Sequence, residues 1–199
     1  MIRDKPNQPV HMTVIRLRKG TIPMTNALEK SKVRSTKWLT VTAMLMALNV
    51  VMSSFSLPVP GGHLYLNDII ICTASILLDP LGAFLVGGVG AFLGDLLFYP
   101  APMFVSLVTH GLQAVVISLC VRKAAQERRF QAAVAGVALG AVIMVVGYSL
   151  GRAFIYSTVE YAILKLPFQI LQAVVGAVVG VLLCFKGRLV DFWDKFSVQ

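Results

Sequence analysis

The sequence predicts an all-α membrane protein of six transmembrane helices with cytoplasmic N- and C-termini, and three observations support this prediction. Hydrophobic residues make up 57% of the 199 residues and charged residues only 14%, with a mean hydropathy of +0.78, whereas soluble domains are about 45–50% apolar and about 25% charged. Apolar runs that approach the length of a bilayer span, about 20 residues, occur repeatedly. Basic residues cluster beside these runs.

The apolar runs define the predicted spans and the division of the chain. They cover residues 38–57, 64–78, 81–99, 103–121, 132–156 and 166–185. The second run is shorter than a bilayer span, so we expect it to be tilted, bent or shielded by protein. Only Asp79 and Pro80 separate it from the third run, which predicts a tight helical hairpin. We divide the chain into a basic cytoplasmic extension (1–35), a transmembrane domain (36–186) and a cytoplasmic tail (187–199). Because Met24 is an in-frame start, residues 1–23 are expected to be dispensable.

The basic residues predict the orientation of the spans. Of the 18 Lys and Arg residues, 16 lie in three segments, residues 3–37, 122–129 and 186–195. Such clusters remain on the cytoplasmic side of a membrane. Six spans place all three segments inside, whereas an odd number would place one basic terminus outside. The predicted outer loops are then 58–63, 99–102 and 157–165, of which only the last carries a basic residue, Lys165. The net charge of +9 therefore indicates orientation, and no nucleic-acid partner is expected.

Strongly polar side chains within the predicted spans gather toward the outer ends. These residues are Asn67, Asp68, Asp95, Tyr99, His110, Gln113, Tyr148, Arg152, Gln169 and Gln172, and the outer segment 57–65 adds His63 and Tyr65. Polar groups in hydrocarbon are costly and commonly line a cavity, whereas a channel or a proton relay would need them at every depth. The inner halves of the spans are almost wholly apolar. The pattern predicts a binding cup that is open to the outside and sealed below.

Several of these residues also have a structural alternative. Asp68 could instead cap a helix, and Asp95 and Arg152 could form an ion pair. His110, Gln169 and Gln172 could link neighbouring helices through hydrogen bonds. Tyr99, Tyr156 and Tyr161 could belong to an interfacial aromatic belt. The segment 58–65 contains two prolines and the pair Gly61-Gly62. We expect it either to close over the cup as a lid or to be an ordinary tight connection.

Small residues predict close contacts between helices. Glycines spaced by four occur at Gly90 and Gly94, Gly136 and Gly140, Gly147 and Gly151, and Gly176 and Gly180. This spacing lets helix backbones approach in lipid, here within the chain or between copies of it.

The cysteines number three and lack paired spacing, which argues against a disulfide framework and against a zinc site. No metal or other cofactor is expected in this chain.

The run PVPGGHLYLNDIIICTASILLDPLGAFLVGGVGAFLGDLLFYPAPMF, preceded by AMLMA at 43–47, resembles the S components of energy-coupling factor (ECF) transporters. The resemblance covers residues 36–186. It implies a six-helix, vitamin-binding subunit in a prokaryotic plasma membrane. It also implies docking on one transmembrane T subunit and two ATPase subunits that use ATP and Mg, with Ala43 and Ala47 on the docking face. Asp79 stands where the family often has a small residue.

The substrate and two other classes of protein remain open from the sequence. The PGGHLYLND stretch resembles S components for hydroxymethylpyrimidine or pyridoxine more than those for riboflavin, with pantothenate and cobalamin as further possibilities. An autonomous small-solute carrier is one alternative class, although coupling residues are missing from the inner halves of the spans. A membrane-embedded enzyme is the other, although no H-x-x-x-H pair is present. No Walker-type phosphate loop occurs either, so partner subunits would have to supply the energy.

Overall fold

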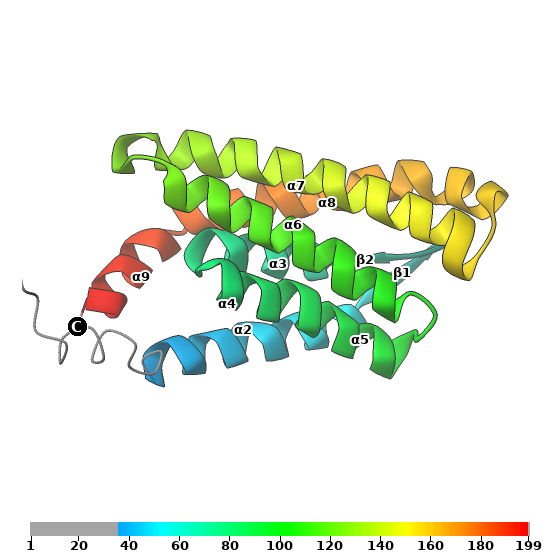
Figure 1. The fold of residues 1–199 in the computed structure, drawn as a ribbon, viewed down its shortest axis with the longest axis horizontal. Coiled ribbons are helices and arrows are strands. Elements are labelled where there is room, and N and C mark those ends of the chain that lie inside the picture. Colours follow the sequence, from blue (N-terminus) through cyan, green and yellow to red (C-terminus); the bar gives the residue numbers. More distant parts are fainter. Residues whose placement is uncertain (1–35, 199) are drawn as a thin grey trace, which may run out of the picture. The chain divides into compact units, whose positions relative to one another are not determined.

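The computed structural model describes residues 36–198, and six helical segments in this range match the predicted spans (Figure 1). They are α2 (Thr36–Ser54), α3 (Asn67–Leu77), α4 (Pro80–Phe84) continued by the π-helical turn η1 (Leu85–Val89) and α5 (Gly90–Phe98), α6 (Met103–Lys123), α7 (Arg129–Gly151) continued by the π-helical turn η3 (Arg152–Tyr156), and α8 (Val159–Phe185). The predicted extension 1–35, including the segment 1–23 that is expected to be dispensable, lies outside the described residues.

Five of these segments are long and apolar enough to cross a membrane, and α3 is too short. Ten of the 11 residues of α3 are buried, and its main neighbours are α8, α6 and α2. The short second run is therefore shielded by protein, which is one of the arrangements expected from its length. The helical membrane class is confirmed, while the count of six spans and the cytoplasmic termini stay predictions.

Asp79 explains the tight connection between α3 and α4. Its carboxylate accepts hydrogen bonds from the backbone N–H of Gly82 (3.3 Å) and from Trp38 Nε1 (2.6 Å). It thereby caps α4, whose first residue is Pro80. The carboxylate at the position where a small residue is expected thus ties α2 to the start of α4.

The outer segment after α2 is a short β-hairpin within the otherwise helical bundle. Strands β1 (Ser56–Val59) and β2 (Gly62–Tyr65) pair antiparallel, with Ser56 opposite Tyr65. Gly61 has φ +80° and Gly62 has φ +147°, a conformation that glycine adopts without a Cβ clash. The turn at this pair of glycines reverses the chain at one end of the bundle.

Helix α8 begins at Val159, so the prediction that Lys165 lies in an outer loop is wrong. The sequence suggested a loop because Glu160, Lys165 and Pro167 interrupt the apolar pattern. The structure accommodates all three within the helix, and Pro167 is tolerated because transmembrane helices can satisfy the freed backbone groups locally. Lys165 is only 2% exposed, and its ammonium donates a hydrogen bond to the backbone carbonyl of His63 in the hairpin.

Glycines allow the helices to pack closely, as their spacing predicts. A Cβ at Gly176 would lie 2.5 Å from the Cβ of Asp68, and one at Gly180 would lie 2.7 Å from the Cβ of Cys72. These two positions set the contact between α8 and α3. Gly140 fits the side chain of Ile117 in the same way, which brings α7 against α6. The contacts within the chain account for these glycines.

The hairpin lies at one end of the bundle (Figure 1), and the two ends differ in the polarity of their buried side chains. At the end away from the hairpin, an apolar cluster includes Ile76, Ile117 and Val137. The predicted tail forms the amphipathic helix α9 (Leu189–Val198), which packs on this cluster through Val190. The hairpin end contains most of the buried polar side chains. The predicted asymmetry along the spans is therefore present in the described bundle.

Candidate functional site

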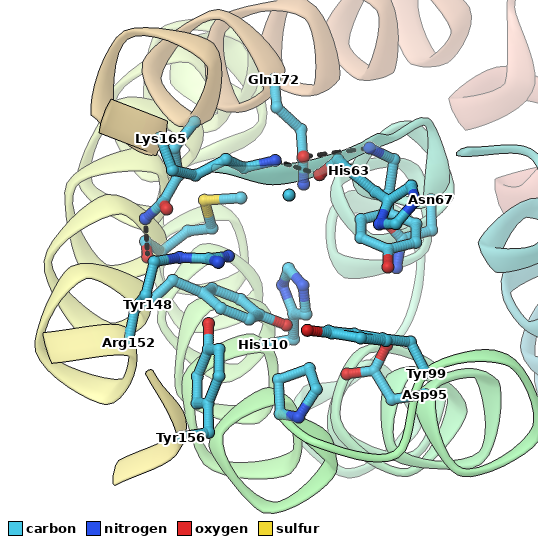
Figure 2. Close-up of a pocket in the computed structure, with 15 residues that line it drawn as sticks. His63, Asn67, Asp95, Tyr99, His110, Tyr148, Arg152, Tyr156, Lys165 and Gln172 are labelled. Atoms are coloured by element: carbon cyan, nitrogen blue, oxygen red, sulfur yellow. Dashed lines mark hydrogen bonds between the residues drawn. The ribbon is translucent and has the colours of Figure 1, made fainter. Parts of the chain in front are cut away.

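A cavity lies beneath the hairpin (Figure 2). Its lining comes from β2, α3, α5, the connection between α5 and α6, α6, α7, η3 and α8 and consists of Gly62, His63, Tyr65, Asn67, Asp95, Tyr99, Pro102, His110, Met144, Tyr148, Arg152, Tyr156, Lys165, Gln169 and Gln172. Small-molecule sites are concave and present a few convergent polar groups. The cavity has both properties.

Ten of the twelve residues predicted to form the cup line this cavity, and the exceptions are Asp68 and Gln113. Both are buried and bonded to lining residues. The residues that the sequence did not assign to the cup are Gly62, Pro102, Met144, Tyr156 and Lys165. Lys165 carried a usable signal, because it and Arg152 are the two basic residues outside the three basic clusters.

Asp68 orients two glutamine side chains behind the cavity. Its carboxylate, 1% exposed, accepts hydrogen bonds from Gln172 Nε2 (2.6 Å) and from Gln113 Nε2 (3.3 Å). Because a carboxylate can only accept, both amides present their NH₂ groups to Asp68 and turn their carbonyl oxygens away. Asp68 forms no cap hydrogen bond at the start of α3. Its place in the structure is a buried support for the two amides.

The orientation of Gln113 assigns the hydrogen on His110. Gln113 Oε1 lies 2.7 Å from His110 Nδ1, and because that oxygen is an acceptor, Nδ1 carries the hydrogen. In the neutral imidazole, Nε2 is then an acceptor. His110 is hydrogen-bonded within its own helix, and its Nδ1 also lies 3.8 Å from Asp68 Oδ1 on the neighbouring helix α3. Its ring meets the edge of Tyr148 at a centroid distance of 5.1 Å.

A second polar cluster joins α5, α6 and α7. The hydroxyl of Ser106 donates to Asp95 Oδ2 and also contacts the hydroxyl of Tyr148. Because Ser106 has a single hydroxyl hydrogen, Tyr148 is the donor in the second bond. Among residues 36–198, Asp95 forms no ion pair with Arg152, so that alternative is wrong. Figure 2 places the two side chains on opposite sides of the cavity.

Three cavity-lining side chains hold the hairpin in place. Arg152 Nη1 donates to the carbonyl of Gly61 (2.8 Å), Lys165 Nζ donates to the carbonyl of His63, and Gln172 Oε1 accepts from the N–H of Tyr65 (3.0 Å). The hairpin therefore lies where the sequence placed a lid, and the opening and closing of that lid stay a prediction. Gln169 differs from Gln172, because it donates to the carbonyl of Val145 (2.8 Å) and links α8 to α7.

Three buried polar atoms of the lining have no hydrogen-bond partner. They are Asn67 Oδ1, Arg152 Nε and Tyr156 Oη. Unpaired buried polar atoms cost about 1–3 kcal/mol each, so a ligand that supplied their partners would be stabilised at these points. Asn67 Oδ1 requires a donor from the ligand, whereas Arg152 Nε requires an acceptor. The free atoms thus define a polarity that a ligand must match.

Aromatic rings line the mouth of the cavity. The ring of His63 lies 6.3 Å from that of Tyr65 and 6.0 Å from that of Tyr99. Burial raises the pKa of Tyr65 above its ordinary value, and the nearby Asp95 acts in the same direction, so its phenol remains protonated at neutral pH.

Within residues 36–198, no group of three or more His, Cys, Asp or Glu residues is arranged to hold a metal ion.

Membrane-length helices, a polar cavity at one end and apolar packing at the other define a multi-pass membrane protein of the binding type. Residues 33–187 match the family described as ECF-type riboflavin transporter, S component, and the chain belongs to this family. It is thus a substrate-binding subunit of a vitamin transporter rather than an enzyme. The resemblance noted in the sequence is confirmed. The family description names riboflavin, which differs from the substrate class favoured by the PGGHLYLND stretch.

Two further proteins are similar to this chain. A protein of Pyrococcus woesei, described as an uncharacterized protein in gap 3'region, is 31% identical over 143 residues, which cover 71% of this chain and 88% of that protein. A solved structure of the S component of a bacterial ECF transporter has a TM-score of 0.66 and 20% identity, and the match covers 80% of this chain and 98% of that one. This structural similarity supports the fold.

Proposed function

We propose that this chain captures a water-soluble vitamin or vitamin precursor at the outer face of a prokaryotic plasma membrane, for import driven by partner ATPases. The observation that supports this proposal is the polar cavity beneath the hairpin, with apolar packing at the opposite end of the bundle. A substrate can enter such a site from one side only. Release on the other side then requires a change of conformation, which binding of ATP by partner subunits would drive.

The substrate we propose contains a planar nitrogen heterocycle. Tyrosine and histidine rings line the cavity and provide faces and edges for stacking. Riboflavin, named in the family description, and hydroxymethylpyrimidine or pyridoxine, favoured from the sequence, all contain such a ring. Pantothenate contains no such ring.

We propose that α2 docks on the transmembrane T subunit. Ala43 and Ala47 are exposed, so neither is used for packing in the described bundle. The other face of α2 is anchored by Asn49, whose Nδ2 donates to the carbonyl of Val86 (2.6 Å), and by the buried Ser53. No residue of α2 lines the cavity. A partner can therefore contact the alanine face without touching the substrate.

The binding step is tested by purifying the full chain from its native membrane and identifying retained small molecules by mass spectrometry. Riboflavin, hydroxymethylpyrimidine and pyridoxine are then titrated by calorimetry. We expect one heterocyclic compound to be retained and to bind at one site per chain. A chain that retains no compound and binds none of the three refutes the proposal. Uptake into liposomes by the chain alone would instead establish an autonomous carrier.

The docking step is tested by Ala43→Trp and Ala47→Trp. A bulky indole prevents close approach of helices at a small-residue face, so we expect loss of cellular uptake and of ATPase co-purification, with ligand affinity within about twofold of wild type. Val142→Trp is the matched control, because Val142 is also exposed but lies on α7. Normal uptake in both alanine variants would contradict the assigned docking face.

A further inference from the structure

Arg152 and Lys165 are two cations in the cavity without an anionic partner. No carboxylate in residues 36–198 lies within ion-pair distance of either side chain. Each is bonded only to a neutral carbonyl oxygen of the hairpin. A buried charge is costly unless it is paired, and Lys165 is only 2% exposed. Within residues 36–198, this pair therefore has no carboxylate in direct contact.

The guanidinium of Arg152 has one edge in use and one edge free. Nη1 donates to Gly61 in the hairpin, whereas Nε is buried and unpaired, and Nη2 forms no hydrogen bond with residues 36–198. The Nε–Nη2 edge presents two parallel N–H donors at the spacing of two oxygen atoms of a carboxylate or phosphate. Arg152 can thus hold the hairpin and an anion at the same time.

Other donors lie on the same side of the cavity as this free edge. Figure 2 shows Arg152 and Lys165 extending into the cavity from the same side, with Tyr156 below them. The Lys165 ammonium uses one of its three hydrogens for His63 and retains two. Tyr156 Oη is buried and unpaired, and the Tyr156 ring centroid lies 5.2 Å from the Arg152 guanidinium carbon.

The carboxylates near the cavity lie away from the two cations. Asp95 lines the opposite side of the cavity (Figure 2), where it accepts the Ser106 hydroxyl, and Asp68 accepts two amides behind the lining. On the α3 side, the free atom is the acceptor Asn67 Oδ1. The cavity therefore offers donors and positive charge at one side and an acceptor at another. A ligand that matches this polarity has an acidic group at one end and an N–H or O–H donor elsewhere.

We propose that the substrate of this S component carries a carboxylate or phosphate group, which sits against the Nε–Nη2 edge of Arg152 and the ammonium of Lys165. This inference rests on the proposed function and changes its candidates, because riboflavin, hydroxymethylpyrimidine and pyridoxine are uncharged. The substrate is then an acidic heterocyclic compound, such as the phosphate ester of one of these vitamins. Because the same two side chains hold the hairpin, the anion lies directly beneath the lid. Substrate recognition and lid contacts then share two residues.

The test uses the full chain and three matched pairs of ligands that differ in the acidic group. Two pairs contain the proposed heterocycle, riboflavin 5′-phosphate with riboflavin and pyridoxine 5′-phosphate with pyridoxine. The third pair, pantothenate with its alcohol pantothenol, tests a carboxylate without a ring. Wild type, Arg152→Gln, Arg152→Lys, Lys165→Met and the exposed control Lys186→Gln are titrated with each member. The compound retained from the native membrane is identified by mass spectrometry in parallel.

We expect the retained compound to be acidic, and we expect wild type to bind the charged member of one pair more tightly. Arg152→Gln and Lys165→Met should bind that member about 10- to 150-fold more weakly, the loss typical of a charge-assisted hydrogen bond. Both variants should also lose the preference for the charged member over the neutral member of that pair. A merely structural defect would weaken the binding of both members and would leave this preference in place. Arg152→Lys keeps the charge without the two-donor edge and should be intermediate.

The outcomes separate this inference from the proposed function. The pair that shows the preference distinguishes a phosphate from a carboxylate. A neutral retained compound, or a preference unchanged in Arg152→Gln and Lys165→Met, overturns the acidic substrate and leaves the vitamin-binding subunit intact. A chain that retains no compound and binds no ligand of the panel overturns both.

Discussion

Replacing Asp68 by asparagine tests whether the cavity is organised from behind. Asp68 does not line the cavity, yet it accepts hydrogen bonds from Gln172 and Gln113. Gln172 in turn holds the N–H of Tyr65 in the hairpin, and Gln113 holds His110. An amide has one acceptor oxygen and one NH₂ group, so in Asp68→Asn one glutamine meets a donor in place of an acceptor.

The geometry gives the size of the effect. The Gln172 bond of 2.6 Å has the short length of a charge-assisted bond, whereas the Gln113 bond of 3.3 Å is long. A hydrogen bond to a charged group contributes about 1.5–3 kcal/mol, so we expect unfolding to require about that much less free energy. The glutamine that loses its partner can rotate its amide, so we also expect ligand affinity to fall about tenfold or more.

The assay is thermal unfolding in detergent without ligand, together with calorimetric titration of the compound retained from the native membrane. The control is Asp191→Asn, which removes an exposed pair with Arg188 (3.2 Å). Exposed pairs contribute about 0–1 kcal/mol, so this variant should match wild type. If Asp68→Asn has the wild-type melting temperature and the wild-type Kd, the carboxylate does not organise the cavity and the reasoning is wrong.

Two further predictions concern packing. Gly176→Ala would place a Cβ 2.5 Å from the Cβ of Asp68. Carbon atoms in contact normally lie about 3.5–4.0 Å apart, so we expect the free energy of unfolding to fall by about 1–3 kcal/mol. The control Gly136→Ala, whose nearest contact is 3.1 Å, should lose clearly less, and equal melting temperatures of the two variants would contradict this. Arg129→Ala removes the 2.6 Å bond to Asp194 that ties α9 to α7, so limited proteolysis should remove the tail faster than in wild type, and an unchanged rate would show that the apolar contacts of α9 suffice.

Most of the fold could be predicted from local patterns in the sequence. Apolar length marks each long helix, because backbone groups in lipid must be bonded within the helix. The shortness of the run 64–78 indicated shielding by protein, and α3 is buried. The start of α8 could not be predicted, because Lys165 and Pro167 are unfavourable in an isolated apolar helix. Their tolerance depends on the hairpin and on neighbouring helices.

The candidate site was only partly predictable. Position along each span was enough to select most of the lining, including Arg152 and His110, because buried polar groups collect around a cavity. Position did not separate Asp68 from Asn67, which are neighbours on α3. The structure directs Asp68 toward the amides behind the cavity and leaves Asn67 in the lining. That difference depends on the packing of α8 against α3.

The sequence by itself determined the membrane class, the helical spans and the concentration of polar residues toward one end. These properties follow from composition and period along a single chain, and they do not need a partner segment. Only the tertiary structure decided which polar atoms are paired. It showed that Arg152 and Lys165 hold the hairpin and retain free donors. The bonds from Arg152 to Gly61 and from Lys165 to His63 join residues that are about 90 to 100 positions apart in the sequence. Helix packing decides whether such residues meet, and their spacing in the sequence does not.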